Sequence, residues 1–127
     1  MKNIKEAEEL TGISRQNIRY YEKMGLLNPK RDAGNGYRKY DEEDIERLKV
    51  ILLFRKLDMP LEEIHKLLDH EIDLQQALDT QKAYLQKEQQ KLEAALAFCD
   101  TIQEQDLAEL DINRCLQEIE KQEKSGN

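Results

Sequence analysis

Apolar side chains recur every three or four residues along most of this chain, a spacing that places them on one face of a helix. A first short helix is expected from about Asn3 to Leu10. A second is expected to begin after Ser14, whose hydroxyl can accept a free amide of the first turn, and to end near Gly25. The residues around Gly12 form a tight turn between them. Two helices joined by a short glycine-containing turn predict a helix-turn-helix.

The pattern changes between residues 28 and 40. Pro29 stops the helical periodicity, and Asn35-Gly36 is typical of a two-residue type I′ hairpin turn, because both central residues can adopt positive φ. Residues 30–31 before this turn and 37–40 after it are predicted to be short strands. The segment therefore predicts a small hairpin, or wing, directly after the helix-turn-helix.

Two more helices are expected before residue 71. Asp41 is a good N-cap for a helix that runs to about Leu57. Pro60 suits the first position of the next helix, which is expected to end at about His70.

Beyond His70 the apolar residues repeat every seven positions, which predicts a shallow coiled coil. The candidate dimerisation residues are Leu78, Leu85, Leu92, Cys99 and Ile102. The expected fold is mainly α: a winged helix-turn-helix DNA-binding domain over residues 1–70, a long dimerising coiled-coil helix over 71–105, and a short C-terminal helical or effector region over 106–127.

The charge of the chain is unevenly distributed. The formal net charge is −7, yet between residues 15 and 39 seven bases face two acids, Glu22 and Asp32. This basic island is what a phosphate backbone would attract, although charge alone equally fits an ordinary solvated face. The bases are Arg15, Arg19, Lys23, Lys30, Arg31, Arg38 and Lys39.

The second helix carries polar donors on one face and Ile18 and Tyr21 on the opposite side. Arginine can pair with guanine and glutamine with adenine in a major groove, while tyrosine and lysine reach phosphates. The helix alone leaves a solvated basic face as an equal interpretation, but a wing that alternates aromatic and basic residues (37–40) directly after it is far more specific. The candidate donors on the helix are Arg15, Gln16, Arg19, Tyr20 and Lys23.

Several segments together resemble the N-terminal signature of the MerR family of transcriptional regulators. They are Thr11-Gly12-Ile13-Ser14, Ile18-Arg19-Tyr20-Tyr21-Glu22, Gly25-Leu26-Leu27, Pro29, Arg31, Gly36-Tyr37-Arg38 and Tyr40, with Pro60-Leu61-Glu62-Glu63-Ile64 resembling the start of the family's second wing helix. Two positions depart from the pattern. Glu8 stands where the family usually has alanine, which questions the packing of the first helix. Asp58 stands where it usually has glycine, which could change the angle of the second wing.

The resemblance implies a homodimer, joined by an antiparallel coiled coil, that binds palindromic promoter DNA. It also implies control of initiation by RNA polymerase through distortion of the spacer between promoter elements, with an effector whose identity the sequence does not give. Carried over by position, the DNA contacts are Arg15, Gln16, Arg19 and Tyr20 on the recognition helix, Tyr37 and Arg38 on the first wing, and Arg55 as a phosphate contact of the second wing.

No phosphate-binding glycine loop, metal-ligand spacing or nucleophile with a base is found, so we expect neither an enzyme nor a bound cofactor or metal. Cys99 and Cys115 fall on apolar positions that burial would explain, although thiols from two subunits could converge as a sensor. His65 and His70 lie too far apart on a helix to chelate together. With no apolar membrane segment, a soluble cytoplasmic protein is expected. The alternative is an adaptor that binds a protein partner through the coiled coil.

Overall fold

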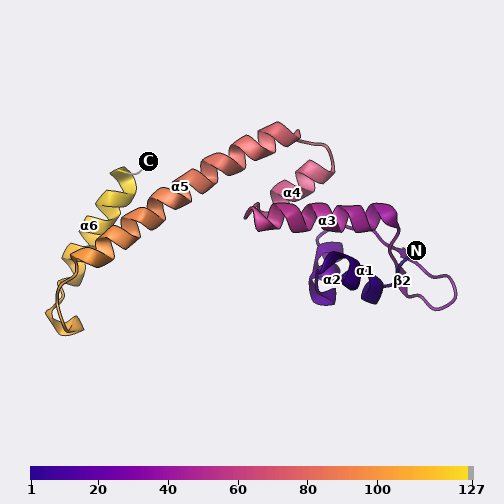
Figure 1. Cartoon of the computed structure of the whole chain (residues 1–127), viewed down its shortest axis with the longest axis horizontal. Coiled ribbons are helices and arrows are strands. Elements are labelled where there is room, and N and C mark those ends of the chain that lie inside the picture. Colours follow the sequence, from indigo (N-terminus) through magenta and orange to yellow (C-terminus); the bar gives the residue numbers. More distant parts are fainter. Residues whose placement is uncertain (126–127) are drawn as a thin grey trace. The chain divides into compact units, whose positions relative to one another are not determined.

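The computed structural model describes residues 1–125 of the chain, and most of them are helical, as the sequence predicts (Figure 1). The chain folds into two compact units, residues 1–78 and 79–127, which are described separately. The elements are α1 (Ile4–Thr11), α2 (Arg15–Lys23), β1 (Lys30–Arg31), β2 (Arg38–Lys39), α3 (Glu42–Lys56), α4 (Leu61–Leu68), α5 (Leu74–Thr101), a 3-10 turn η1 (Leu107–Glu109) and α6 (Ile112–Ser125).

The first two helices form the predicted helix-turn-helix. Asn3 caps α1 and exchanges hydrogen bonds with Glu6, so that two amides at the helix start are satisfied. Gly12 ends α1 at φ 75°, a left-handed conformation that glycine adopts without steric cost. The Ser14 hydroxyl then accepts the amide of Asn17 at 3.2 Å and starts α2, as expected.

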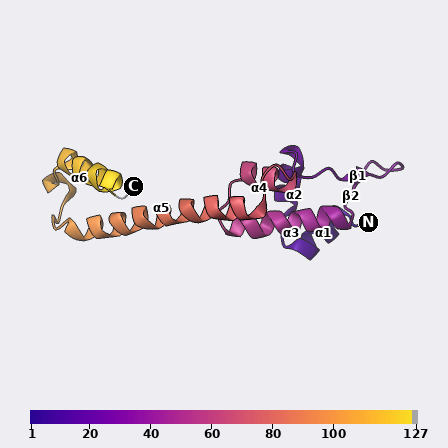
Figure 2. The same ribbon diagram turned by 90° about the horizontal axis from the view of Figure 1, so that it is seen from above.

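The hairpin is present, but its turn differs from the prediction. Lys30 pairs with Lys39 and Arg31 with Arg38 in an antiparallel register. Six residues connect β1 to β2 instead of a two-residue type I′ turn. Within this connection the Asp32 carbonyl accepts the Gly36 amide, and the Asp32 amide donates to the Tyr37 carbonyl. Of the two residues expected at positive φ, only Gly36 adopts it, at 72°. In both views the loop extends beyond the helices of its own unit (Figures 1 and 2).

Two apolar cores hold residues 1–78 together, one against the first half of α3 and the other against its second half. The first joins α1, α2, Tyr40 and the start of α3 through Ala7, Ile13, Ile18, Leu27, Tyr40, Ile45 and Leu48. The second joins α3, α4 and the first residues of α5 through Leu26, Ile51, Phe54, Met59, Ile64 and Ala77. Tyr21 packs against both cores, so the rotation of α2 is fixed from two sides.

The connection between α3 and α4 contains a backbone conformation that its residue does not favour. Asp58 lies at φ 62°, in the left-handed region where a side chain costs energy that glycine avoids. The sequence expectation that Pro60 is the first helical residue is off by one, because Pro60 is the N-cap and α4 begins at Leu61. The helix ends at Leu68, and His70 follows at φ 60°.

Residues 79–127 contain most of α5, η1 and α6. α5 ends at Thr101, earlier than the expected limit of the coiled-coil segment at residue 105. After the 3-10 turn, α6 runs back beside the C-terminal part of α5 (Figures 1 and 2), and Phe98, Leu110 and Cys115 line a cleft between them. No helix in the described part of the chain combines the length and the apolarity that a membrane crossing requires.

Candidate nucleic-acid interface

The outer face of α2 is polar and exposed, while its inner face is buried. Ile18 is fully buried in the first core and Tyr21 is partly buried. Because these two side chains face inward, helical spacing turns the opposite side of α2 toward solvent. All the recognition-helix residues expected from the sequence are exposed on it: Arg15, Gln16, Arg19, Tyr20 and Lys23.

Arg15, the first residue of α2, is in contact with the preceding helix. Its backbone amide donates to Glu8 Oε2 at 2.8 Å, and its side-chain Nε lies 3.6 Å from Glu8 Oε1. Glu8 therefore supplies a carboxylate to the start of α2, where it also interacts favourably with the partial positive charge of the helix end. The sequence pattern marked Glu8 as a doubtful packing residue, but its carboxylate instead lies on the partly exposed surface beside α2.

The wing is joined to the recognition helix by an ion pair. Arg38 Nε donates to Glu22 Oε2, and both side chains are partly buried, at 33% and 21% exposed. A phosphate-contacting role for Arg38 stays a prediction, but the structure gives this residue a position that the sequence did not suggest. It links β2 to α2 and fixes the hairpin relative to the recognition face.

Tyr40 is a core residue rather than part of the exposed wing surface that the sequence suggested for residues 37–40. It is completely buried, and its backbone exchanges two hydrogen bonds with Lys2, at 2.8 and 2.7 Å. Burial raises the pKa of the Tyr40 phenol, and the nearby Glu22 carboxylate raises it further. Tyr37 is the exposed aromatic residue of the wing, at 74%.

The loop of the wing is organised by Asp32. Its Oδ2 lies 2.8 Å from Lys39 Nζ, and its Oδ1 accepts the amides of Gly34 and Asn35 at 2.7 and 3.2 Å. These contacts, the Lys39 hydrogen bond first, lower the pKa of Asp32 to about 2. Arg31 donates from its guanidinium to the Gly36 carbonyl at 3.2 Å. Two basic residues of the hairpin, Arg31 and Lys39, therefore make contacts that stabilise its loop.

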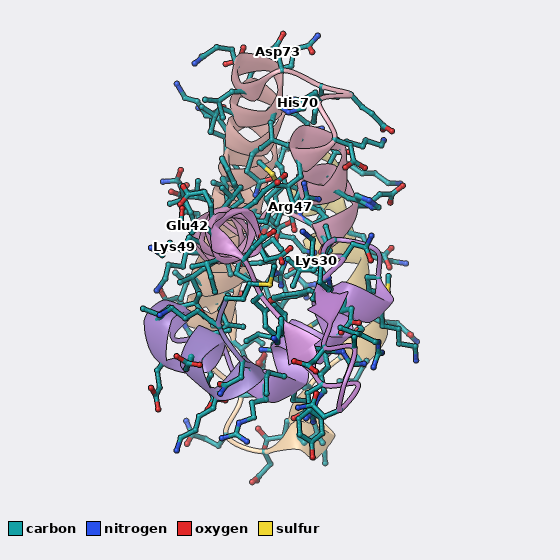
Figure 3. The ribbon with its side chains drawn as sticks, turned by 90° about the vertical axis from the view of Figure 1, so that its right-hand side faces the viewer. Lys30, Glu42, Arg47, Lys49, His70 and Asp73 are labelled. Atoms are coloured by element: carbon teal, nitrogen blue, oxygen red, sulfur yellow. The ribbon has the colours of Figure 1, made fainter. Side chains whose placement is uncertain are left out.

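Two arginines of α3 make contacts with the segment from the end of α3 through α4, where the family resemblance implies a second wing. Arg55 donates to the Met59 carbonyl at 2.8 Å and so closes the turn before α4. Arg47, labelled in Figure 3 on the side of α3 that faces α4, donates to the Leu26 carbonyl at 3.0 Å and lies 3.7 Å from Asp69 Oδ1. Arg55 was expected from the sequence as a phosphate contact and is exposed in the structure, whereas Arg47 was not expected.

The candidate dimerisation residues differ in how far their own chain buries them. Leu78 is partly buried against the second core of its own chain. Leu85 is 38% exposed, Leu92 is 64% exposed and Ile102, just past the end of α5, is 39% exposed. Leu96, at 68%, adds an apolar side chain to this stripe that the heptad pattern omitted. Leu85, Leu92 and Leu96 form an apolar stripe along α5 that is exposed to solvent in the single chain.

The two cysteines are not fully covered by their own chain, and the burial expected for Cys99 in the dimer seam stays a prediction. Cys99 is exposed and Cys115 is only partly buried, and Phe98 occupies the buried position beside Cys99. Within residues 1–125, no group of three or more cysteine, histidine or acidic side chains is placed to hold a metal ion. His65 is partly exposed and lies 3.0 Å from Asp69, and His70 follows the end of α4.

The contacts that sequence reasoning missed are made by acids. Glu8 and Glu22 each hold an arginine that was predicted to contact DNA. The sequence assigned Glu22 no partner, and the arginine that it holds lies sixteen residues away on a different element. An isolated acid within an otherwise basic stretch of sequence is the signal that could have prompted a search for the partner of Glu22.

A family model described as the MerR HTH family regulatory protein matches residues 2–71, more than half of the chain. The chain belongs to the MerR family. The helix-turn-helix and the wing lie within the matched residues, which confirms the family that the sequence resemblance suggested. The mainly α fold agrees with solved MerR-family structures.

Individual relatives agree with this assignment. The chain is 36% identical over 98 residues to the HTH-type transcriptional activator Mta of Bacillus subtilis, a match that covers 76% of this chain and 38% of Mta. The crystal structure of MtaN, the N-terminus of that multidrug transporter activator, superposes with a TM-score of 0.73 at 34% identity, over 80% of this chain and 96% of MtaN. The chain thus spans about two fifths of this curated relative.

A further solved structure bears on the interface. HiNmlR, a MerR-family regulator that lacks the sensor domain and is bound to promoter DNA, matches with a TM-score of 0.55 at 25% identity, over 79% of this chain and 81% of that chain.

Proposed function

We propose that this protein is a transcriptional regulator that binds promoter DNA sequence-specifically as a homodimer. The observation that carries the proposal is the exposed face of α2, which presents arginine, glutamine and tyrosine side chains while Ile18 and Tyr21 anchor its back in two cores. A rigid helix with such a face can enter a major groove and contact base edges. The relative HiNmlR, which is bound to promoter DNA, supports this assignment.

The residues divide into two groups by their position on the interface. Arg15 and Gln16 occupy the first turn of α2, the end that enters the groove in helix-turn-helix docking, and are proposed to contact bases. Arg19 and Tyr20 lie further along the same face. Tyr37, Arg38 and Arg55 lie on the hairpin and at the end of α3 and are proposed to contact the phosphate backbone, which positions the protein without specifying sequence.

Dimerisation is proposed through the apolar stripe of α5. A single chain leaves Leu85, Leu92 and Leu96 exposed along this helix, and burying such side chains is the main driving force for association of long helices. The domain limits proposed from the sequence assign DNA binding to residues 1–70, dimerisation to residues 71–105 and effector response to residues 106–127. The first residues of α5 nevertheless pack into the second core.

Control of transcription is proposed to work by deformation of the DNA. A dimer that bends and untwists a promoter spacer changes how RNA polymerase meets the two promoter elements, and the energy of that deformation depends on the DNA sequence. An effector is proposed to bind near α6 and the adjoining part of α5. Its chemical class is left open.

The experiment that tests the function begins with selection of DNA by the full-length chain from a random duplex library. We expect recovery of a palindromic sequence that two chains protect together in a footprint. Transcription from a promoter that carries this sequence in its spacer should change when the protein is added, and a promoter with the sequence scrambled should not respond. Recovery of no common sequence would contradict the proposal and favour the adaptor alternative.

A further inference from the structure

Glu8 and Arg15 form a contact between the two helices of the helix-turn-helix that involves both the backbone and the side chain of Arg15. One oxygen of the carboxylate accepts the Arg15 amide at 2.8 Å, and the other lies 3.6 Å from the guanidinium Nε. The two side chains are 36% and 47% exposed, so the pair lies at the surface, at the end of α2 that is proposed to enter the groove.

The backbone of Glu8 is itself fixed. Its carbonyl accepts the amide of Gly12 at 2.8 Å, in the left-handed turn that ends α1. The carboxylate itself is held by the Arg15 amide, so both the backbone and the side chain of Glu8 have a fixed partner. It can therefore restrict an arginine, whose long side chain otherwise loses considerable rotamer entropy when it binds a partner.

We propose that Glu8 is a positioning residue that sets the DNA sequence preference of Arg15. By engaging Nε, the carboxylate leaves the two terminal nitrogens of the guanidinium as the donors available to a guanine edge. It also places a negative charge close to the path of the phosphate backbone, which disfavours the alternative in which Arg15 binds any phosphate it meets. Both effects raise affinity for the preferred sequence relative to other DNA. This inference rests on the proposed function, since it presupposes that α2 reads DNA.

The substitution Glu8→Gln separates charge from structure. Glutamine keeps an oxygen that can accept the Arg15 amide, so the start of α2 is preserved, but it removes the ionic contact with the guanidinium. Glu9→Gln is the matched control, because Glu9 is the exposed neighbour of Glu8 on α1 and takes part in none of the ion pairs within residues 1–125.

The measurement is the ratio of two dissociation constants for the full chain at one salt concentration. One probe is a duplex selected from a random library by the wild-type protein, and the other is a scrambled duplex of the same composition. We expect Glu8→Gln to lower this preference roughly threefold to fivefold, mainly through tighter binding to the scrambled duplex. The slope of log K against log salt for the scrambled duplex should become steeper by up to about one unit. Glu9→Gln should leave the preference unchanged.

A double variant shows whether Glu8 acts through Arg15. In an Arg15→Ala background, Glu8→Gln should no longer change the preference, whereas a purely structural effect on α2 would persist there. A wild-type preference that survives Glu8→Gln, or an equal loss in both backgrounds, would overturn this assignment alone. A wild-type protein with no preference between the two duplexes would instead overturn the proposed function, and this inference with it.

Discussion

The ion pair between Glu22 and Arg38 predicts that the wing and the recognition helix are energetically coupled. The pair joins β2 to α2 and is only 21% and 33% exposed. Fully exposed ion pairs contribute about 0.2–1 kcal/mol, whereas removing one partner of a buried pair costs about 3–5 kcal/mol. From the intermediate exposure we expect Arg38→Ala to lower the free energy of unfolding by about 1–2 kcal/mol.

The effects of the two single substitutions should differ. Arg38→Ala leaves the Glu22 carboxylate partly buried next to the buried phenol of Tyr40, without its cation. Glu22→Ala leaves a more exposed guanidinium, which water can solvate. We therefore expect Glu22→Ala to cost less than Arg38→Ala, and the double variant to be more stable than the sum of the single losses predicts, by about 1 kcal/mol.

Urea unfolding of the four proteins measures this coupling, and DNA titration over a range of salt concentrations measures its effect on binding. If the terminal nitrogens of Arg38 also contact phosphate, Arg38→Ala lowers the slope of log K against log salt by about 1 on selected and scrambled DNA alike. Lys23→Ala is the control for stability, because Lys23 is an exposed base on the same helix. Strictly additive losses, with no coupling energy, would refute the inference that this pair fixes the wing.

Three further predictions concern the backbone, the wing loop and α5. Asp58→Gly should raise the free energy of unfolding in urea by about 0.5–1 kcal/mol, because glycine accepts φ 62° without strain, and an unchanged or lower stability would contradict the assigned conformation. Ionised Asp32, with its lowered pKa, stabilises the wing loop above pH 4, and this contribution is lost as the pH falls from about 4 toward 2. The NMR amide signal of Gly34 should report this change with pH, and Asp32→Asn should remove it. Leu85→Asp combined with Leu92→Asp should give a monomer in light scattering that no longer binds the selected duplex, and a monomeric wild-type protein at micromolar concentration would contradict the coiled-coil proposal.

Those features of the fold that depend on local chemistry could be predicted from the sequence. Ser14 and Asp41 cap the helices that follow them, because their side chains act on amides only a few residues away. The hairpin turn was predicted wrongly for the same local reason, since Asn35-Gly36 favours a type I′ turn in isolation. In the folded chain, Asp32 accepts two loop amides and selects a longer connection with only Gly36 at positive φ.

The exposed face of the candidate site was predictable, but its internal contacts were not. Helical periodicity places Arg15, Gln16 and Arg19 on one side of α2 regardless of tertiary structure. The pairing of Arg38 with Glu22 depends on where the fold places β2 relative to α2, which no periodicity encodes. Tyr40 likewise continues an exposed strand in the sequence, yet its side chain lies in the first core and its backbone pairs with Lys2, a residue far away in the sequence.

The central claim, that the first turn of α2 reads DNA sequence, is tested most directly by comparing Arg15→Ala and Gln16→Ala with Lys23→Ala. The dissociation constants for the selected and the scrambled duplex are measured for each full-length protein at one salt concentration, since salt changes every phosphate contact. We expect Arg15→Ala and Gln16→Ala each to cost roughly 1–3 kcal/mol on the selected duplex and much less on the scrambled one, whereas Lys23→Ala weakens both alike. A preference that remains at the wild-type value in both Arg15→Ala and Gln16→Ala would contradict the account.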